Sequence, residues 1–217
     1  MFVGHFALGF AAKRATPRTS LAVLFAAAQL ADLLWPVLLA VGLEQVRLEP
    51  GNTAFTPLDF VSYPYSHSLA LLAVWGVALA AIVRPKPDRT ALILGLLVVS
   101  HWLLDWITHR PDMPLYPGSA RYGLGLWNSV PATMTIELAM FAIGVWIYAA
   151  STRAGDGVGR WAFVAFVALL VLVYVGNALG SPPPTVTAIW ITALAGAAIL
   201  IAWSWWFDRH RTAAVSA

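Results

Sequence analysis

The sequence contains no cysteine and very little charge. Without cysteine, the chain can form neither disulfides nor thiolate metal sites, and it offers no cysteine nucleophile. Charged residues make up 11% of the 217 residues, whereas average soluble domains carry about 25%. Hydrophobic residues make up 60%, and this combination excludes a disordered chain and an ordinary soluble enzyme. The 13 Lys and Arg residues are scattered through short connections, so we expect no nucleic-acid partner.

Long apolar runs indicate a membrane protein. A helix needs about 20 apolar residues to cross a hydrocarbon core of about 30 Å. Six segments have this length or nearly so, namely 20–43, 66–83, 90–109, 129–150, 161–180 and 185–207. The stretch 2–12 covers only about 17 Å as a helix, so we expect a half-helix or re-entrant segment packed against the bundle. The predicted fold is all-α, a polytopic transmembrane helical bundle of about six spans plus this N-terminal segment.

We expect one integral-membrane domain over residues 1–217, with 4–150 carrying the site and 160–207 forming two scaffold spans. The distribution of Lys and Arg predicts its orientation, because cytoplasmic connections are enriched in both residues. One side holds Lys13, Arg14, Arg18, Arg84, Lys86, Arg89, Arg153, Arg160, Arg209 and Arg211, and the other holds Arg47, Arg110 and Arg121. This bias predicts a cytoplasmic C-terminus and places the two long connections, 44–65 and 110–128, outside.

Several ionisable residues interrupt the apolar segments. Asp32, His101, Asp105 and Glu137 lie inside predicted spans, and His5 and His67 lie in or beside apolar helices. At 1.5 Å per residue, all of them fall in the middle-to-outer half of the membrane. Four unpaired charges at this depth would cost on the order of 10 kcal/mol. These groups must therefore face inward and neutralise one another, or bind a cation.

The segment 101–109 concentrates this chemistry. His101, Asp105 and His109 are four residues apart and share one helical face. Imidazole and carboxylate ligands suit Zn²⁺, Mn²⁺ or Fe²⁺. His109 borders Arg110 and Pro111, so we expect a helix C-terminal residue there rather than a ligand. His210, in a charged tail, is expected to be solvated.

The same residues carry a resemblance to a known family. His5 follows Gly4, Asp32 ends an apolar run, His67 stands between two serines, and His101 and Asp105 form a His-x-x-x-Asp pair. In this order they resemble the membrane-bound metal-dependent hydrolase-like family of bacteria, which includes the LexA-regulated inner-membrane hydrolases. The resemblance covers about residues 4–118, and a weaker likeness links the set to zinc-dependent phospholipase C.

The resemblance implies an integral-membrane metal-dependent hydrolase of the bacterial cytoplasmic membrane. Its metal, Zn with Mn or Fe as alternatives, would be held by His5, Asp32, His67, His101 and Asp105. Glu137 is a sixth candidate ligand, and Asp59 or Glu137 would be the general base. The expected partners are membrane lipids, and the expected substrate is an amphiphilic ester or phosphate. This account requires the Asp32 carboxylate to lie within about 10 Å of the His101 imidazole.

Two other functions fit the same residues. Intramembrane Asp, Glu and His also relay protons or bind ions in transporters and channels. A purely structural polar cluster, which only specifies helix packing, is the second alternative.

Overall fold

The computed structural model describes residues 1–83 and 88–214, and within these ranges the chain is mainly helical. The described helices are α1 (Val3–Ala15), α2 (Leu21–Ala28), α3 (Leu30–Ala40), α4 (Pro64–His67), α5 (Leu69–Val83), α6 (Arg89–Thr108), α7 (Val130–Ser151), α8 (Gly157–Leu179) and α9 (Val186–Asp208). The short strands pair antiparallel as β1 (Gln45–Leu48) with β2 (Leu58–Ser62), β3 (Met113–Pro114) with β4 (Arg121–Tyr122), and β5 (Thr152–Ala154) with β6 (Arg211–Ala213).

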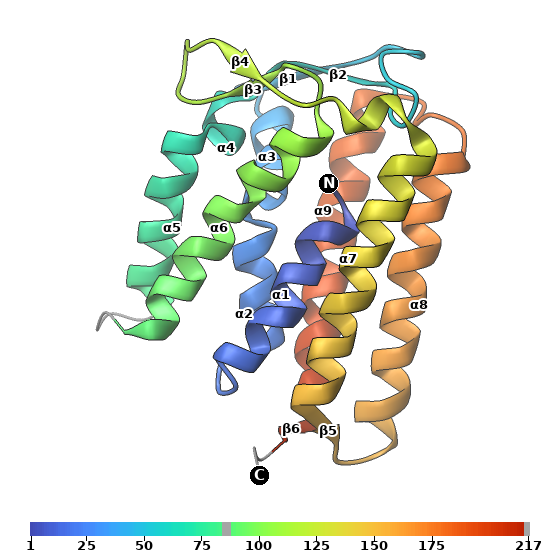
Figure 1. The fold of residues 1–217 in the computed structure, drawn as a ribbon. Coiled ribbons are helices and arrows are strands. Elements are labelled where there is room, and N and C mark those ends of the chain that lie inside the picture. The colour runs from blue at the N-terminus through green and yellow to red at the C-terminus, as the bar shows by residue number, and fades with distance from the viewer. Residues whose placement is uncertain (84–87, 215–217) are drawn as a thin grey trace.

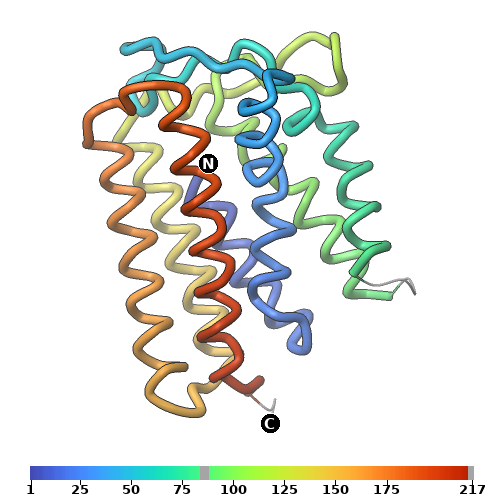
Figure 2. Tube along the Cα trace, turned by 180° about the vertical axis from the view of Figure 1, so that it is seen from behind, coloured from blue at the N-terminus to red at the C-terminus, as the bar shows by residue number. Residues whose placement is uncertain are grey.

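The long helices form a bundle with a different cover at each end (Figure 1). Strands β1 to β4 lie across one end, and β5, β6 and the C-terminus lie at the other. Seen from behind, α9 runs between α8 and the α2–α3 pair (Figure 2). The helical bundle agrees with the sequence prediction, whereas the strands were not predicted. They form in the connections 44–65 and 110–128 and beside the C-terminal tail.

The number of spans is where the structure and the sequence prediction differ. Among the described residues, four helices, α6 to α9, are long and apolar enough to cross a membrane, and the bent α2–α3 pair brings the number to five. The second predicted span, 66–83, is divided, because Ser68 has an extended backbone that separates α4 from α5. The remaining α5 has 15 residues, or about 22 Å of helix. Six spans are therefore not confirmed.

A sharp bend divides the first predicted span. Helices α2 and α3 meet at Gln29 with an angle of 61°. In a continuous helix the carbonyl of Ala28 would accept the backbone N–H of Asp32. Here it accepts instead from the His101 side chain at 2.9 Å. The bend thus links the first predicted span to α6, and it places Asp32 in the first turn of α3.

Helix α1 lies inside the bundle against α7, α2 and α6. Its 13 residues agree with the half-helix predicted for 2–12, and Figure 1 shows the N-terminus among the helices rather than at either end. Gly144 of α7 allows this packing, because a Cβ atom there would lie 2.4 Å from the Ala7 carbonyl oxygen. The close approach carries His5 into the interior, where it is 1% exposed.

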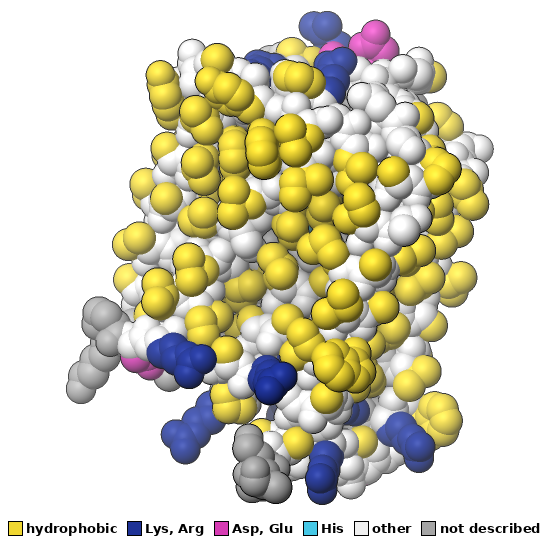
Figure 3. All heavy atoms as spheres, viewed as in Figure 1, with side chains coloured by type: hydrophobic (Ala, Val, Ile, Leu, Met, Phe, Trp, Pro, Cys, Tyr) yellow, Lys and Arg dark blue, Asp and Glu magenta, His cyan; other side chains and the backbone are white. Residues whose placement is uncertain are grey.

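Basic side chains gather at the end of the bundle that carries the C-terminus, and apolar side chains cover the face between the two ends (Figure 3). Two residues of the predicted basic side, Arg84 and Lys86, lie outside the described residues. Lys13 differs from the others because it is buried and pairs with Asp208 at 2.6 Å. This pair joins α1 to the last turn of α9.

Candidate metal centre

Asp105 of α6 is the centre of a buried cluster of imidazoles and carboxylates. Its Oδ1 lies 3.0 Å from His5 Nε2, and its Oδ2 lies 3.1 Å from His101 Nε2. His101 precedes Asp105 by one helical turn, so both side chains leave α6 on the same face. The predicted His-x-x-x-Asp pair therefore forms, and α1 adds a second imidazole to it.

Asp32 and His67 approach the same point from α3 and α4. Asp32 Oδ1 lies 3.5 Å from His67 Nε2 and 3.7 Å from His101 Nε2. The second distance is well inside the predicted limit of about 10 Å. His67 Nε2 also lies 3.8 Å from Asp105 Oδ2. The four separations among these atoms span 3.1 to 3.8 Å.

These separations suit a shared divalent ion. Ligand atoms about 2.1 Å from a tetrahedral Zn²⁺ lie about 3.4 Å apart, which falls within the observed range. Two groups of three ligands have atoms within 4.8 Å of one another, one formed by His5, His101 and Asp105 and the other by Asp32, His67 and His101. His101 belongs to both groups, so the residues fit one ion or two neighbouring ions.

The hydrogen bond of His101 determines which nitrogen faces the cluster as a ligand. Its Nδ1 lies 2.9 Å from the Ala28 carbonyl oxygen, which can only accept, so Nδ1 carries the proton. In the neutral imidazole, Nε2 then presents a lone pair toward Asp32 and Asp105. This buried Nε2 has no hydrogen-bond partner among the described residues. The Nε2 lone pair and the two carboxylates it faces are all electron-pair donors, and such a set of donors can bind a metal cation.

A second hydrogen-bond chain orients His67 in the same way. The Ser66 hydroxyl donates to Glu44 Oε2 at 2.6 Å, and its oxygen lies 2.7 Å from His67 Nδ1. Because the single hydroxyl proton points to Glu44, His67 Nδ1 must donate to Ser66. The His67 Nε2 lone pair therefore faces the cluster. Glu44 is itself fixed, since it is 2% exposed and accepts the backbone N–H groups of Tyr65 and Ser66 at 2.8 Å.

Substitution of Glu44 by Gln is expected to weaken metal binding by about 10- to 100-fold, the usual effect of losing a partner that orients a ligand. The amide removes the negative charge that keeps the Ser66 proton turned away from His67. Isothermal titration of the metal-free protein with Zn²⁺ measures the change. Glu49→Gln, at an exposed position of the same connection, serves as the matched control. Equal affinities for the two variants would contradict a role of Glu44 in orienting His67.

His5 and the amino group of Met1 lie beside Oδ1 of Asp105. The His5 ring stacks on His101 with centroids 3.7 Å apart and an interplanar angle of 2°. The Met1 ammonium contacts Asp105 Oδ1 and lies 3.2 Å from the Thr108 hydroxyl. This ammonium supplies positive charge at Oδ1, whereas Oδ2 faces only imidazoles among the described ion-pair partners of Asp105.

The two predicted catalytic carboxylates have partners outside the ligand groups. Glu137 Oε2 accepts the backbone N–H groups of Phe2 and Gly4 at 2.8 and 3.4 Å, so it caps the first turn of α1. Its Oε1 is buried without a partner among the described residues. Asp59, on β2, forms an ion pair with Arg110. The catalytic roles of Glu137 and Asp59 stay predictions.

Access to the cluster is uneven. The Asp32 side chain is 38% exposed, whereas the side chains of His101 and Asp105 are 0% and 2% exposed. A reactant would therefore reach the cluster on the side of α3 that carries Asp32.

Glu44, His109 and Asp112 are also buried near the cluster, and the sequence reasoning did not assign them to it. Glu44 and Asp112 lie in polar connections, where acidic residues are ordinary. The available signals were the shared helical face of His109 with His101 and Asp105, and the spacing of three residues between His109 and Asp112. His210, expected to be solvated, lies at the opposite end of the bundle and pairs with the exposed Asp156 at 2.6 Å.

A sequence model described as the YdjM inner membrane protein family matches residues 1–180. This match includes every predicted metal ligand and ends at the close of α8. No match was found among curated proteins or among solved structures.

Proposed function

The chain belongs to the YdjM inner membrane protein family, and from this premise and the site geometry we propose that it is a metal-dependent hydrolase of the inner membrane. The observation that carries the proposal is the convergence of four buried or half-buried ligand atoms at separations near those of a Zn²⁺ site. The hydrolase-like family resemblance supports the same chemistry.

In this proposal the metal is held by Asp32, His67, His101 and Asp105. His5, which lies beside Asp105 Oδ1, is a further metal ligand. A divalent ion held there would lower the pKa of a water ligand to about 7 and would polarise an ester or phosphoryl oxygen. The chain's own contribution is to hold the imidazoles in the ligating tautomer through Ala28 and Ser66.

Glu137 is the better of the two candidates for a general base. Its Oε1 has no described hydrogen-bond partner, whereas the Asp59 carboxylate is neutralised by Arg110. Its Oε2 is held by the start of α1, which also carries the Met1 amine that contacts Asp105. A carboxylate fixed on one oxygen holds the other oxygen at a defined position, which is what a proton acceptor requires.

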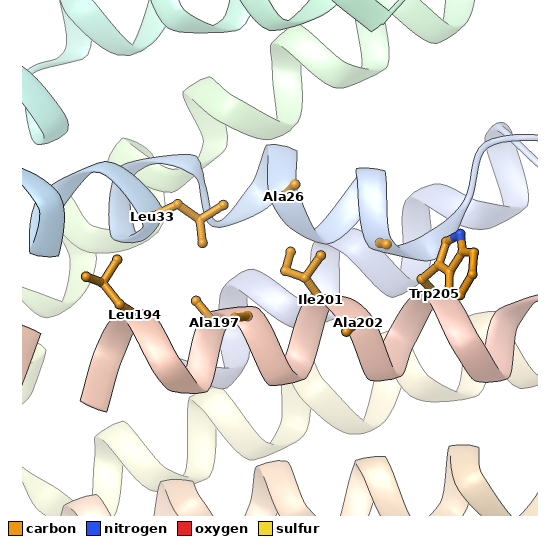
Figure 4. A pocket seen from close by; sticks show the side chains of 9 residues that line it. Ala26, Leu33, Leu194, Ala197, Ile201, Ala202 and Trp205 are labelled. Carbon is orange, nitrogen blue, oxygen red and sulfur yellow. The ribbon is translucent and has the colours of Figure 1, made fainter. Parts of the chain in front are cut away.

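The surface beside Asp32 supports an amphiphilic substrate. An apolar groove runs between the α2–α3 pair and α9 (Figure 4). Its walls are formed by Ala22, Ala26, Leu33, Leu194, Ala197, Ala198, Ile201, Ala202 and Trp205. Leu33 of this groove follows Asp32 directly in α3, so the groove passes the cluster at the same level of the helix. We therefore assign the substrate to lipid-linked esters or phosphates.

The orientation is part of the proposal. The basic end of the bundle would face the cytoplasm by the positive-inside rule, together with the C-terminus. The ligand cluster lies toward the opposite end, because Asp105 is near the close of α6 and His67 follows β2. The substrate head group would then enter from the outer half of the bilayer.

Reconstitution into liposomes tests the function. The protein is stripped with a chelator, reloaded with Zn²⁺ or Mn²⁺, and assayed for product release from a panel of phospholipids and lipid-linked phosphates. We expect release that requires metal, is lost in Asp105→Asn and persists in the control His210→Ala. Metal or proton flux without hydrolysis would contradict the proposal in favour of a transporter. Thermal stability that does not change when a chelator is added would contradict the proposal in favour of a structural role.

A further inference from the structure

His109 is the last buried polar residue of the α6 face that carries His101 and Asp105. It forms the C-cap of α6, its backbone N–H donates to the Asp105 carbonyl, and it is 2% exposed. Helix α6 thus ends one turn beyond Asp105. The His109 side chain therefore lies on the same helical face as His101 and Asp105 and points into the protein.

The Nδ1 atom of His109 is held by a carboxylate. It lies 2.9 Å from Asp112 Oδ1, and the Tyr63 hydroxyl donates to the same oxygen at 2.7 Å. The Asp112 carboxylate only accepts, and His109 Nδ1 must therefore donate to it.

The other nitrogen of His109 faces the cluster. Its Nε2 lies 3.9 Å from Asp105 Oδ2, which is the oxygen that His101 and His67 also face. This separation is too long for a hydrogen bond, but it is within about 0.5 Å of the spacing between two ligands of one tetrahedral Zn²⁺.

The arrangement of His109 repeats that of two predicted ligands. In His67, His101 and His109 alike, Nδ1 donates to a fixed oxygen and Nε2 points to Asp105 Oδ2. Ligating histidines in metalloproteins commonly donate their second N–H to a carboxylate or a backbone carbonyl in this way. His109 has a carboxylate as its support where His101 has a backbone carbonyl, and its Nε2 lies farther from Asp105 Oδ2, at 3.9 Å against 3.1 Å.

Aromatic side chains hold the His109 ring in place. The ring centroid lies 4.1 Å from Trp127 and 4.8 Å from Phe60. Both neighbours belong to the segments that cover this end of the bundle. The ring is thus confined on several sides, and a confined imidazole loses little conformational entropy when it binds a metal.

From this geometry we propose that His109 is a further ligand of the metal centre, on its outer side, with Asp112 as the carboxylate that fixes its ring. The inference rests on the proposed metal centre. His109 does end α6, as the sequence predicted, and the inference adds a ligand role to that position. It extends the ligand set beyond the residues matched by the hydrolase resemblance. The ion suited to this additional imidazole is Zn²⁺, Mn²⁺ or Fe²⁺.

Cobalt-substituted protein provides a test that does not depend on activity. The metal-free wild type, His109→Gln and Asp112→Asn are titrated with Co²⁺, and the visible absorption bands and affinities are recorded. We expect His109→Gln to change the position and intensity of the bands, because a nitrogen ligand is lost. Asp112→Asn retains the ligand, and we expect a drop in affinity of about 10- to 100-fold.

The control is His210→Gln, which removes an imidazole at the opposite end of the bundle. Thermal unfolding of the metal-free variants shows that each is folded, and Asp112→Asn keeps the test valid if His109→Gln does not fold. Unchanged bands and affinities in both variants, beside a wild type that binds Co²⁺, would overturn the role of His109 alone. A wild type that binds no Co²⁺ would overturn both this inference and the proposed function.

Discussion

Replacement of Asp105 by Asn is expected to lower the affinity for Zn²⁺ by more than about 100-fold, since the loss of an orienting partner alone costs about 10- to 100-fold. Asp105 is the residue on which the cluster converges, with His5 near Oδ1 and His101 and His67 near Oδ2. The amide would present an N–H₂ group in place of one carboxylate oxygen, and an N–H₂ group cannot ligate a metal.

Elemental analysis of protein purified without chelator measures this effect directly. We expect wild type to retain bound metal and Asp105→Asn to fall below about 0.2 metal per chain, even after incubation with Zn²⁺. Asp59→Asn is the matched control, because this carboxylate lies on β2 and pairs with Arg110. Equal metal contents in wild type and Asp105→Asn would show that Asp105 is not a ligand.

Replacement of Asp208 by Ala is expected to destabilise the protein by about 3–5 kcal/mol, the usual cost of removing one partner of a buried ion pair. Asp208 accepts from Lys13 at 2.6 Å, from the Tyr148 hydroxyl at 2.7 Å and from the backbone N–H of Leu21 at 2.9 Å. These contacts join α1, α2, α7 and α9. The substitution leaves the Lys13 ammonium buried without a counter-charge.

Thermal unfolding in detergent, followed by circular dichroism, measures the loss of stability. Asp156→Ala is the control, because Asp156 lies at the same end of the bundle and is exposed. The double variant Lys13→Met with Asp208→Leu is expected to recover much of the stability, since an apolar pair needs no counter-charge. A single variant as stable as wild type would contradict the structural role given to this pair.

The sequence predicted the helices best where an apolar run is both long and uninterrupted. Helices α7, α8 and α9 lie within a few residues of the predicted segments 129–150, 161–180 and 185–207. The bend between α2 and α3 was not predictable from the sequence. The residue at the bend is Gln29, which does not break helices, and the nearby Pro36 lies within α3 rather than at the bend. Tertiary contact determines the break, since the Ala28 carbonyl that it releases accepts from His101.

The candidate ligands were recognisable because ionisable residues are costly in apolar helices. Asp32, His101 and Asp105 interrupt such helices, and the structure brings them together. The supporting residues Glu44 and Asp112 were not recognisable, because they lie in polar connections where charge carries no penalty. Their importance follows from burial and from the hydrogen bonds that reach His67 and His109.

The most direct test of the account is to locate the metal in crystals of the protein grown with Zn²⁺. Anomalous scattering measured on both sides of the zinc absorption edge identifies the element and its position. We expect an anomalous peak within about 2.3 Å of Asp105 Oδ2 and the Nε2 atoms of His67 and His101. A crystal in which the Met1 ammonium alone balances Asp105, with no peak among these three side chains, would contradict it.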